Sequence, residues 1–252
     1  MSKEFEKRYR IPVYDTDFRG RLFLHSLFNY VQDIAAAHAE ILKFGREDLQ
    51  KNNRFWILAR MYASINAMPS WGEEITLRTR PLGVDGLFAL RDVGLSDSNG
   101  SVIAAVTTSW VVVDITSRRP VRPDTLPDLA SGEFSGNQPL IRNAEKIGPP
   151  ADGCPVTELF IVKPSDLDVN LHVNNVKYIQ WMYDTIPVSY LSEHVPVSAE
   201  INYLSEAVEG DSVRVKYEIP GSGNNRIHCS VIRESDSREL CRIMTEWIPV
   251  AN

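Results

Sequence analysis

The sequence DLDVNLHVNN, residues 166–175, is the densest group of polar side chains outside the turns, and it directly precedes a helical pattern. An earlier segment, DTDFRGRLFL at residues 15–24, has the same two aspartates at the same spacing and also precedes a helical pattern. Working outward from these two segments, the same order of signals follows each of them. The chain therefore reads as one structural unit written twice.

In the first copy, a strand pattern over residues 5–13 leads into a helix of about 18 residues. Its apolar stripe contains Leu27, Val31, Ile34, His38 and Ile41 at three- and four-residue steps, and Gly45 stands where a left-handed C-terminal cap is expected. Alternating or apolar runs then predict strands at 56–67, 74–80, 88–96 and 102–115, with a hairpin turn at 97–100.

The second copy repeats this order with a strand at 158–162, a helix at 174–185 ended by Pro187, and strands at 198–204, 212–219, 226–234 and 239–249. Matched pairs support a duplication: Asp15 and Asp166 are 151 positions apart, and Trp110 and Trp247 are 137 apart. A sheet with one long amphipathic helix buries both apolar surfaces when the helix packs on the sheet. We therefore expect an α+β fold of two tandem units, at 1–116 and 156–252, joined by a proline-rich linker at 117–155.

Composition excludes several classes of function. The net charge of -6 argues against a general nucleic-acid binder. Polar residues interrupt every apolar run before the roughly 20 residues of a membrane span, and the charged N-terminus does not resemble a secretory signal, so we expect a cytoplasmic protein without a membrane partner. Cys154, Cys229 and Cys241 are too widely spaced for a zinc site, and the last two fit buried strand positions.

Alternation along an extended backbone would place Asp168, Asn170 and His172 on one side of the segment. The following helix offers free N–H groups near 173–175 for an oxyanion, and Asn174 or Asn175 is expected to cap it. The alternative is a polar turn that only starts a helix. Because the first copy has Arg19 and Arg21 in place of Asn170 and His172, the functional interpretation is favoured.

Two stretches, DLDVNLHVNNVKYIQW at 166–181 and ILARMYASINAMPSWGEEI at 57–75, resemble the acyl-acyl carrier protein thioesterases of plants and bacteria. The resemblance covers nearly the whole chain and implies a double hot-dog fold, in which an antiparallel sheet wraps each long helix. It also implies that Asp168, Asn170 and His172 are catalytic, together with Glu206 in the segment AEINYLSEA at 199–207. Without the resemblance, Glu206 would read as a solvated charge. In plant members a cysteine follows this acid, whereas here Ala207 does.

The resemblance implies hydrolysis of fatty acyl-acyl carrier protein, with Glu206 and His172 activating a water and Asn170 positioning that water or the carbonyl. Asp168 would either orient this network or attack the carbonyl directly. No metal or cofactor is indicated. The first copy, with Arg19, Arg21 and Met68, is expected to be non-catalytic and to hold the acyl chain.

Several alternatives stay open. An acyl-CoA thioesterase would share the site and differ only in the carrier. A non-catalytic acyl-binding module is another alternative. A hot-dog dehydratase is disfavoured because its histidine would be followed by Phe-Pro, whereas Val173 and Asn174 follow His172. An acidic carrier protein requires a basic docking patch, for which the candidates are Lys7, Arg8, Arg10, Arg118, Arg119 and Arg122. The chain is expected to be a monomer or homodimer.

Overall fold

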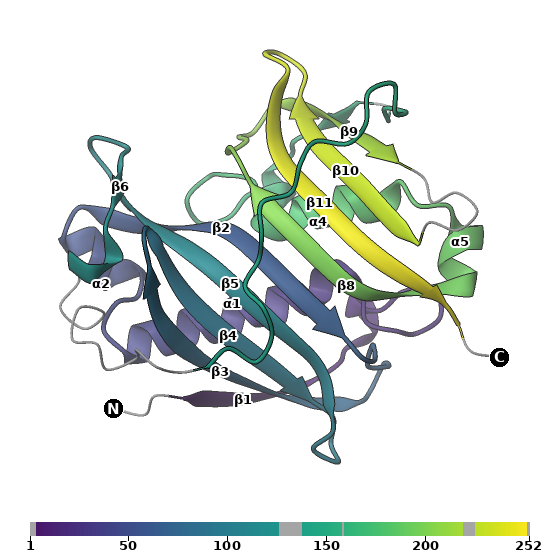
Figure 1. Ribbon diagram of the computed structural model, residues 1–252, viewed down its shortest axis with the longest axis horizontal. Coiled ribbons are helices and arrows are strands. Elements are labelled where there is room, and N and C mark those ends of the chain that lie inside the picture. The colour runs from purple at the N-terminus through teal and green to yellow at the C-terminus, as the bar shows by residue number, and fades with distance from the viewer. Residues whose placement is uncertain (1–3, 126–137, 158, 219–224, 251–252) are drawn as a thin grey trace. The chain divides into compact units, whose positions relative to one another are not determined.

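The computed structural model describes residues 4–125, 138–157, 159–218 and 225–250. The chain divides into two compact units, of which the first runs to Ala144 and the second from Glu145, with Leu24–Ser26 grouped with the second. Each unit contains one long helix and one antiparallel sheet (Figure 1). This composition of each unit agrees with the predicted α+β class.

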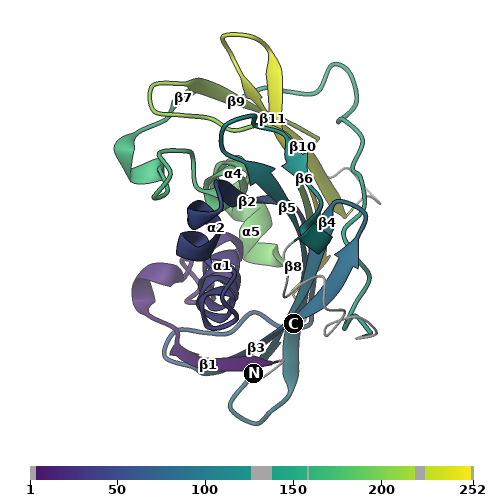
Figure 2. The ribbon, with the colours of Figure 1, turned by 90° about the vertical axis from the view of Figure 1, so that its left-hand side faces the viewer.

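The first unit is built on helix α1 (Leu24–Ile41), followed by the short helix α2 (Arg46–Lys51). Its strands are β1 (Phe5–Arg10), β2 (Arg54–Ile65), β3 (Glu74–Asp85), β4 (Phe88–Ser96), β5 (Val102–Asp114) and β6 (Pro120–Val121). They pair in the order β1-β3-β4-β5-β2, with β6 on β5. Figure 2 shows α1 against one face of this sheet, where Phe28 and Ile34 are fully buried.

The second unit has the helices α4 (Asn175–Asp184) and α5 (Val188–Glu193). Its strands are β7 (Phe160–Ile161), β8 (His194–Tyr203), β9 (Ser212–Glu218), β10 (Arg226–Arg233) and β11 (Arg238–Pro249), in the order β8-β11-β10-β9-β7. Ile179 and Met182 of α4 are fully buried, as are Val215 and Ile243 of the sheet. Short 3-10 turns, η1 (Val13–Asp15) and η3 (Pro164–Asp166), precede the two polar segments, and η2 (Pro123–Thr125) follows β6.

The duplication extends to individual hydrogen bonds. Trp110 donates its indole N–H to Thr108 Oγ1 at 2.9 Å, and Trp247 donates to Thr245 Oγ1 at 2.8 Å. Gly72 and Gly210 both have a backbone φ of 83°. The matched positions found in the sequence therefore have the same local geometry.

Two residues predicted to end the long helices, Gly45 and Pro187, have a different position in the structure. Lys43, with φ 63°, takes the left-handed position after α1, whereas Gly45 has φ -70° and stands before α2. Pro187 likewise stands before α5. Gly45 and Pro187 are thus the N-terminal caps of two short helices. Each of these helices has too few turns to be recognised from periodicity.

Between residues 138 and 150 the linker lies on the sheet faces opposite the helices (Figures 1 and 2), whereas β6, near its start, pairs with β5. In the first unit, Leu140 donates its N–H to Asp92 Oδ2 at 2.8 Å. In the second unit, the Asn202 amide accepts from the Ile147 N–H and donates to the Glu145 carbonyl, both at 2.9 Å. Side chains therefore satisfy the backbone of these linker residues, and the linker and its bounds stay a prediction.

Candidate active site

The polar segment of the second unit is a tight turn held together by Asp168. Its Oδ1 atom accepts the N–H groups of Asn170 at 2.7 Å and His172 at 3.2 Å, while its Oδ2 accepts the Asn170 side-chain amide at 3.3 Å. The Asp168 N–H donates to the His172 carbonyl at 2.7 Å and closes the turn. Both carboxylate oxygens of Asp168 are thus engaged in holding the loop.

The expectation of an extended segment is wrong. Leu171 has a positive φ of 61°, which reverses the chain between Asn170 and His172. Asp168 favours this reversal because a short carboxylate accepts N–H groups two and four residues ahead of it. Asp168, Asn170 and His172 are therefore neighbours through a turn and not through strand alternation.

The first unit contains the same turn. Asp17 Oδ1 accepts the N–H groups of Arg19 at 2.8 Å and Arg21 at 3.0 Å, and the Arg19 guanidinium binds Asp17 Oδ2 at 2.9 Å. Gly20, with φ 72°, takes the place of Leu171. Both copies therefore need the aspartate to form the turn, and they differ in the residues around it.

His172 faces Glu206 across the second unit's turn. The His172 Nε2 and Glu206 Oε2 atoms lie 3.4 Å apart, with the two side chains 24% and 41% exposed. A single antiparallel β-bridge joins His172 to Val208 and brings the loop after β8 beside the turn. The structure thus places the histidine together with the acid, at the solvent boundary where a substrate has access.

The matching positions of the first unit cannot form this pair. Arg21 stands for His172, and a corresponding bridge joins Arg21 to Ser70. Met68 stands at the position of Glu206, 138 residues earlier. Neither an arginine nor a methionine serves as a general base near neutral pH, because arginine stays protonated and a thioether binds no proton.

Helix α4 begins immediately after the turn, and Asn174 caps it by accepting the Val176 N–H on its side chain at 3.2 Å. The N–H groups of Val173 and Asn174 are already used, because they donate to the carbonyls of Ala207 and Asp166 at 2.8 Å. Two of the three donors expected for an oxyanion are therefore occupied. The Asn175 N–H makes no hydrogen bond within the described part of the chain and is the remaining backbone donor.

The described residues offer no cluster of metal ligands, and two of the three cysteines are buried. They contain no group of three or more His, Cys, Asp or Glu side chains able to hold a metal ion. Cys229 and Cys241 are fully buried in the second unit, and burial raises the pKa of both thiols. A raised pKa disfavours the thiolate that a cysteine nucleophile requires.

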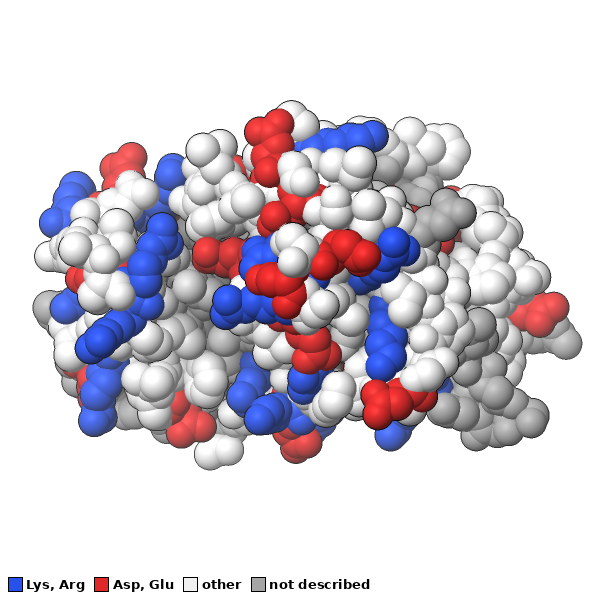
Figure 3. All heavy atoms as spheres, turned by 90° about the horizontal axis from the view of Figure 1, so that it is seen from above, with Lys and Arg blue, Asp and Glu red and all other residues white. Residues whose placement is uncertain are grey.

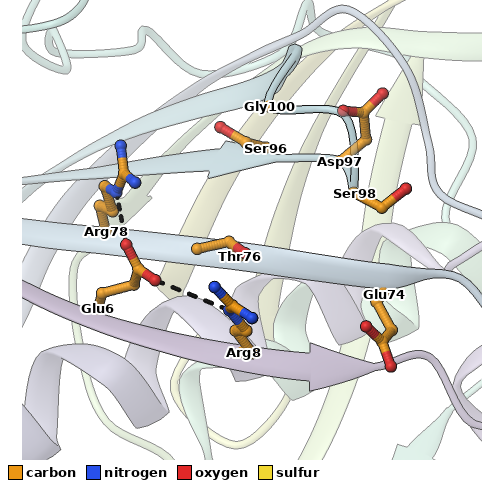
Figure 4. A pocket seen from close by; sticks show the side chains of 9 residues that line it. All are labelled: Glu6, Arg8, Glu74, Thr76, Arg78, Ser96, Asp97, Ser98 and Gly100. Atoms are coloured by element: carbon orange, nitrogen blue, oxygen red, sulfur yellow. Dashed lines mark hydrogen bonds and ion pairs between the residues drawn. The ribbon is translucent and has the colours of Figure 1, made fainter.

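Two hollows of the first unit lie on its exposed strands. Figure 4 shows the smaller, of about 280 Å³, where Glu6 forms ion pairs with Arg8 and Arg78. The larger, of about 470 Å³, borders Asp92 and Leu140 of the linker contact. Neither hollow contains any of the four predicted site residues. Within the described residues, none of the helices combines the length and hydropathy of a membrane span.

Comparison with known proteins connects this geometry to a family. The chain is 26% identical over 260 residues to the chloroplastic palmitoyl-acyl carrier protein thioesterase of Cuphea hookeriana, covering 97% of this chain and 62% of that protein. The corresponding protein of Gossypium hirsutum is 27% identical over 269 residues, with 97% and 64% covered. The chain thus spans less than two thirds of the length of these relatives.

Two solved structures share the fold along their whole length. An acyl-ACP thioesterase from Bacteroides thetaiotaomicron superposes with a TM-score of 0.87 at 24% identity, covering 98% of this chain and 100% of that one. The 12:0-ACP thioesterase from Umbellularia californica gives a TM-score of 0.88 at 22% identity, with 99% of each chain covered. The predicted double hot-dog fold is confirmed.

Two family models divide the chain between them. The model of the acyl-ACP thioesterase N-terminal domain matches residues 2–128, and that of the C-terminal domain matches residues 153–249. Since the first match alone covers half of the chain and the second contains the histidine and the acid, the chain belongs to the acyl-ACP thioesterase family.

Proposed function

We propose that this protein hydrolyses the thioester of fatty acyl-acyl carrier protein to a free fatty acid and the carrier protein. The observation that carries the proposal is the His172–Glu206 pair, 3.4 Å apart, which the second unit has and the otherwise matching turn of the first unit lacks. The relatives' names support the substrate class, and the family supports the reaction.

In the proposed reaction, Glu206 accepts a proton from water while the water oxygen attacks the thioester carbonyl. His172 holds the carboxylate. When the tetrahedral intermediate collapses, the C–S bond breaks, the proton held by Glu206 passes to the departing sulfur, and the carrier leaves as a thiol while Glu206 returns to its carboxylate form. A positioned general base contributes typically about 10²- to 10⁴-fold. Glu206 is partly exposed, so water reaches it without any rearrangement of the buried core.

Asp168 and Asn170 have supporting roles in this proposal. The Asp168 carboxylate accepts three hydrogen bonds of the turn, which reduces its availability as a nucleophile and favours the water mechanism over an anhydride. The Asn170 amide, oriented by Asp168, is placed to position the water or the carbonyl. The Asn175 N–H is the proposed backbone donor to the oxyanion.

Apolar side chains form the edge of the site, and we define Val169, Leu171 and Val208 as its apolar rim. They are 73%, 71% and 45% exposed, although two of them lie on the turn that carries His172. Exposed apolar side chains beside a reactive polar pair fit contact with the pantetheine arm and the first carbons of an acyl chain. The first unit as the holder of the remaining acyl chain stays a prediction, as does a cytoplasmic location.

The structure separates the six candidate docking residues into two groups. Lys7, Arg8 and Arg10 lie on β1, at one edge of the first unit's sheet, while the three arginines follow β5. Asp33 pairs with Lys7 at 2.6 Å and Asp124 with Arg122 at 2.8 Å, which neutralises both cations.

Glu6 also pairs with Arg8, so Arg10 on β1 and the two adjacent arginines Arg118 and Arg119 remain, and we take the adjacent pair as the better candidate for docking an acidic carrier. Both are exposed on the turn between β5 and β6, and Arg118 lies over the Phe55 ring at 5.6 Å. The left-hand part of Figure 3, on the side of the first unit, shows several Lys and Arg side chains. Local positive charge of this kind attracts an acidic partner even to a chain of net charge -6.

The proposal is tested by single-turnover hydrolysis of C8 to C18 acyl chains carried on acyl carrier protein and on CoA. We expect free fatty acid from the protein-bound thioesters, and a loss of about 10²-fold or more in Glu206→Ala and in His172→Ala. Glu209→Ala, three residues along on an exposed position, is the matched control and should retain full rate. Faster hydrolysis of acyl-CoA would mean that CoA, and not the carrier protein, is the carrier. Full activity in both site variants would refute the assignment of Glu206 and His172. An inactive wild type would favour an acyl-binding module.

A further inference from the structure

The peptide bond that follows Glu206 is held by side chains on both of its sides. Arg233 of β10 donates from Nη1 to the Glu206 carbonyl at 3.3 Å, and the Ala207 N–H donates to the Tyr178 hydroxyl of α4 at 3.2 Å. We call Tyr178 and Arg233 the peptide clamp. A backbone N–H accepted by a tyrosine hydroxyl is uncommon, because most buried N–H groups bind backbone carbonyls.

Both members of the clamp are themselves fixed. Tyr178 is 2% exposed, and its ring packs edge-on against Trp181 at 5.5 Å and Tyr203 at 6.0 Å. The Arg233 guanidinium binds both oxygens of Asp236, at 3.0 and 2.8 Å, and lies 3.4 Å from Asp211. The clamp therefore transmits the rigidity of the helix and the sheet to the loop that carries Glu206.

The first unit forms the same loop without a clamp. The N–H groups of Asn66 and Ala67 both donate to the Ile103 carbonyl, as those of their second-unit counterparts both donate to the Leu240 carbonyl. The Leu22 N–H donates to the Pro69 carbonyl, as Val173 does to Ala207. These backbone bonds are thus shared by both copies, and the clamp is added to them in the second copy.

The first copy lacks both partners of the hydrogen bond between Ala207 and Tyr178. Pro69 stands at the position of Ala207 and has no N–H to donate, and Leu27 stands at the position of Tyr178 and has no hydroxyl to accept one. The hydrogen bond therefore exists only in the copy with a histidine–acid pair. Because the hydrogen bond and the histidine–acid pair occur in the same copy, the clamp is linked to the reaction and not to folding of the loop.

We propose that Tyr178 and Arg233 are positioning residues that set the backbone of Glu206 so that its carboxylate reaches His172 and the attacking water. The inference rests on the proposed function, because it acts through the same general base. Glu206 is 41% exposed, and among the described residues its carboxylate has a single ion pair, with His172. The backbone is therefore the main restraint on where the carboxylate lies, and a displacement of about 1 Å can reduce a rate by about 10²-fold.

The test uses Tyr178→Phe, which removes one hydroxyl and preserves the ring packing. We expect kcat for acyl-acyl carrier protein to fall by about 10- to 100-fold while KM changes by less than about 3-fold. Arg233→Lys, which keeps the charge but loses the fork that binds Asp236, should lower kcat in the same direction. Tyr30→Phe is the matched control: it removes a hydroxyl that donates to Asp15 beside the first unit's turn, and kcat should stay within about 2-fold.

A double-mutant cycle separates positioning from a general loss of structure. In the Glu206→Ala background, Tyr178→Phe should change the residual rate by less than about 2-fold, because the group that it positions has been removed. An undiminished effect of Tyr178→Phe in that background, or a wild-type kcat in the single variant, overturns the clamp. Full activity of Glu206→Ala itself overturns the site assignment, so the two failures are distinguishable.

Discussion

His172 and Glu206 meet at 3.4 Å although they lie on separate loops, one before α4 and the other after β8. The backbone bonds that join these loops occur in both copies of the repeat, whereas the histidine and the acid occur only in the second. The repeated fold thus supplies the proximity of the two positions, and substitution at those positions supplies the chemistry. The predictions below separate these two contributions.

Asp168 and Asp17 should contribute similarly to stability and differently to activity. Each holds its turn by accepting two backbone N–H groups, so Asp168→Ala and Asp17→Ala should each lower the free energy of unfolding by about 1–3 kcal/mol in urea titrations. Only Asp168→Ala should reduce single-turnover hydrolysis. An Asp168→Ala protein with wild-type stability and no activity would instead indicate a direct chemical role for this carboxylate.

Leu171 occupies a backbone conformation that disfavours a side chain, and Gly20 occupies it in the first copy. We expect Leu171→Gly to raise the free energy of unfolding by about 0.5–1 kcal/mol. The left-handed conformation costs leucine about 1–2 kcal/mol, and the greater freedom of glycine in the unfolded chain offsets part of this gain. The substitution should lower kcat/KM because the apolar rim loses one of its three side chains. Lys43→Gly, at φ 63° after α1, is the control that should gain stability without losing activity; equal activity of both variants would remove Leu171 from the site.

The long elements were predictable because periodicity is a local signal, and the repeat was predictable because the two copies can be matched position by position. The strand over 88–96 and the long helix before it follow from periodicity alone, and the 151-residue offset matches both aspartates of the turn. The reversal at Leu171 was not predictable, because leucine rarely adopts positive φ and the alternating pattern fits a strand equally well. Tyr178 was not singled out as a site residue either, since its position on a helix indicates burial and says nothing of the loop that its hydroxyl meets.

The roles of the four predicted site residues depend on contacts that no local pattern encodes. The sequence places Asp168, Asn170 and His172 close together, but the pairing of His172 with Glu206 required the β-bridge between His172 and Val208. The occupation of the Val173 and Asn174 N–H groups is likewise a tertiary effect, because their acceptors lie outside the helix. The catalytic roles, and the boundaries of the linker at 117 and 155, stay predictions.

Asp92 should make stability decrease with rising pH. Burial raises its pKa above the usual value of about 4, so the folded state retains a proton that the unfolded state releases. In the window from about pH 4 up to the folded pKa, each rise in pH therefore favours unfolding. Asp92→Asn keeps an acceptor for the Leu140 N–H and removes this slope, which urea titrations between pH 4 and 8 will measure.

The exposed Asp85 gives the matched control for this measurement. Asp85→Asn should leave the pH dependence of the wild type in place, because the carboxylate there has not been taken out of water. An unchanged pH slope in Asp92→Asn would mean that Arg80, 3.7 Å away, compensates for burial of the Asp92 carboxylate.

Arg118 and Arg119 should affect the carrier protein and not the chemistry. Arg118→Ala/Arg119→Ala should raise KM for acyl-acyl carrier protein by about 3- to 10-fold at low salt, with kcat and the rate on acyl-CoA unchanged. Lys7→Ala is the control, because its charge is already paired with Asp33. Equal KM values for the double variant and the wild type across salt concentrations would place docking elsewhere.

The central claim is that Glu206 activates a water that attacks the thioester directly. A single turnover in ¹⁸O-labelled water, followed by mass spectrometry of the fatty acid and of the peptides containing Asp168 and Glu206, tests it. We predict label in the released fatty acid and none in either carboxylate. Label in the side chain of Asp168 or Glu206 after one turnover would contradict this account and establish a covalent anhydride in its place.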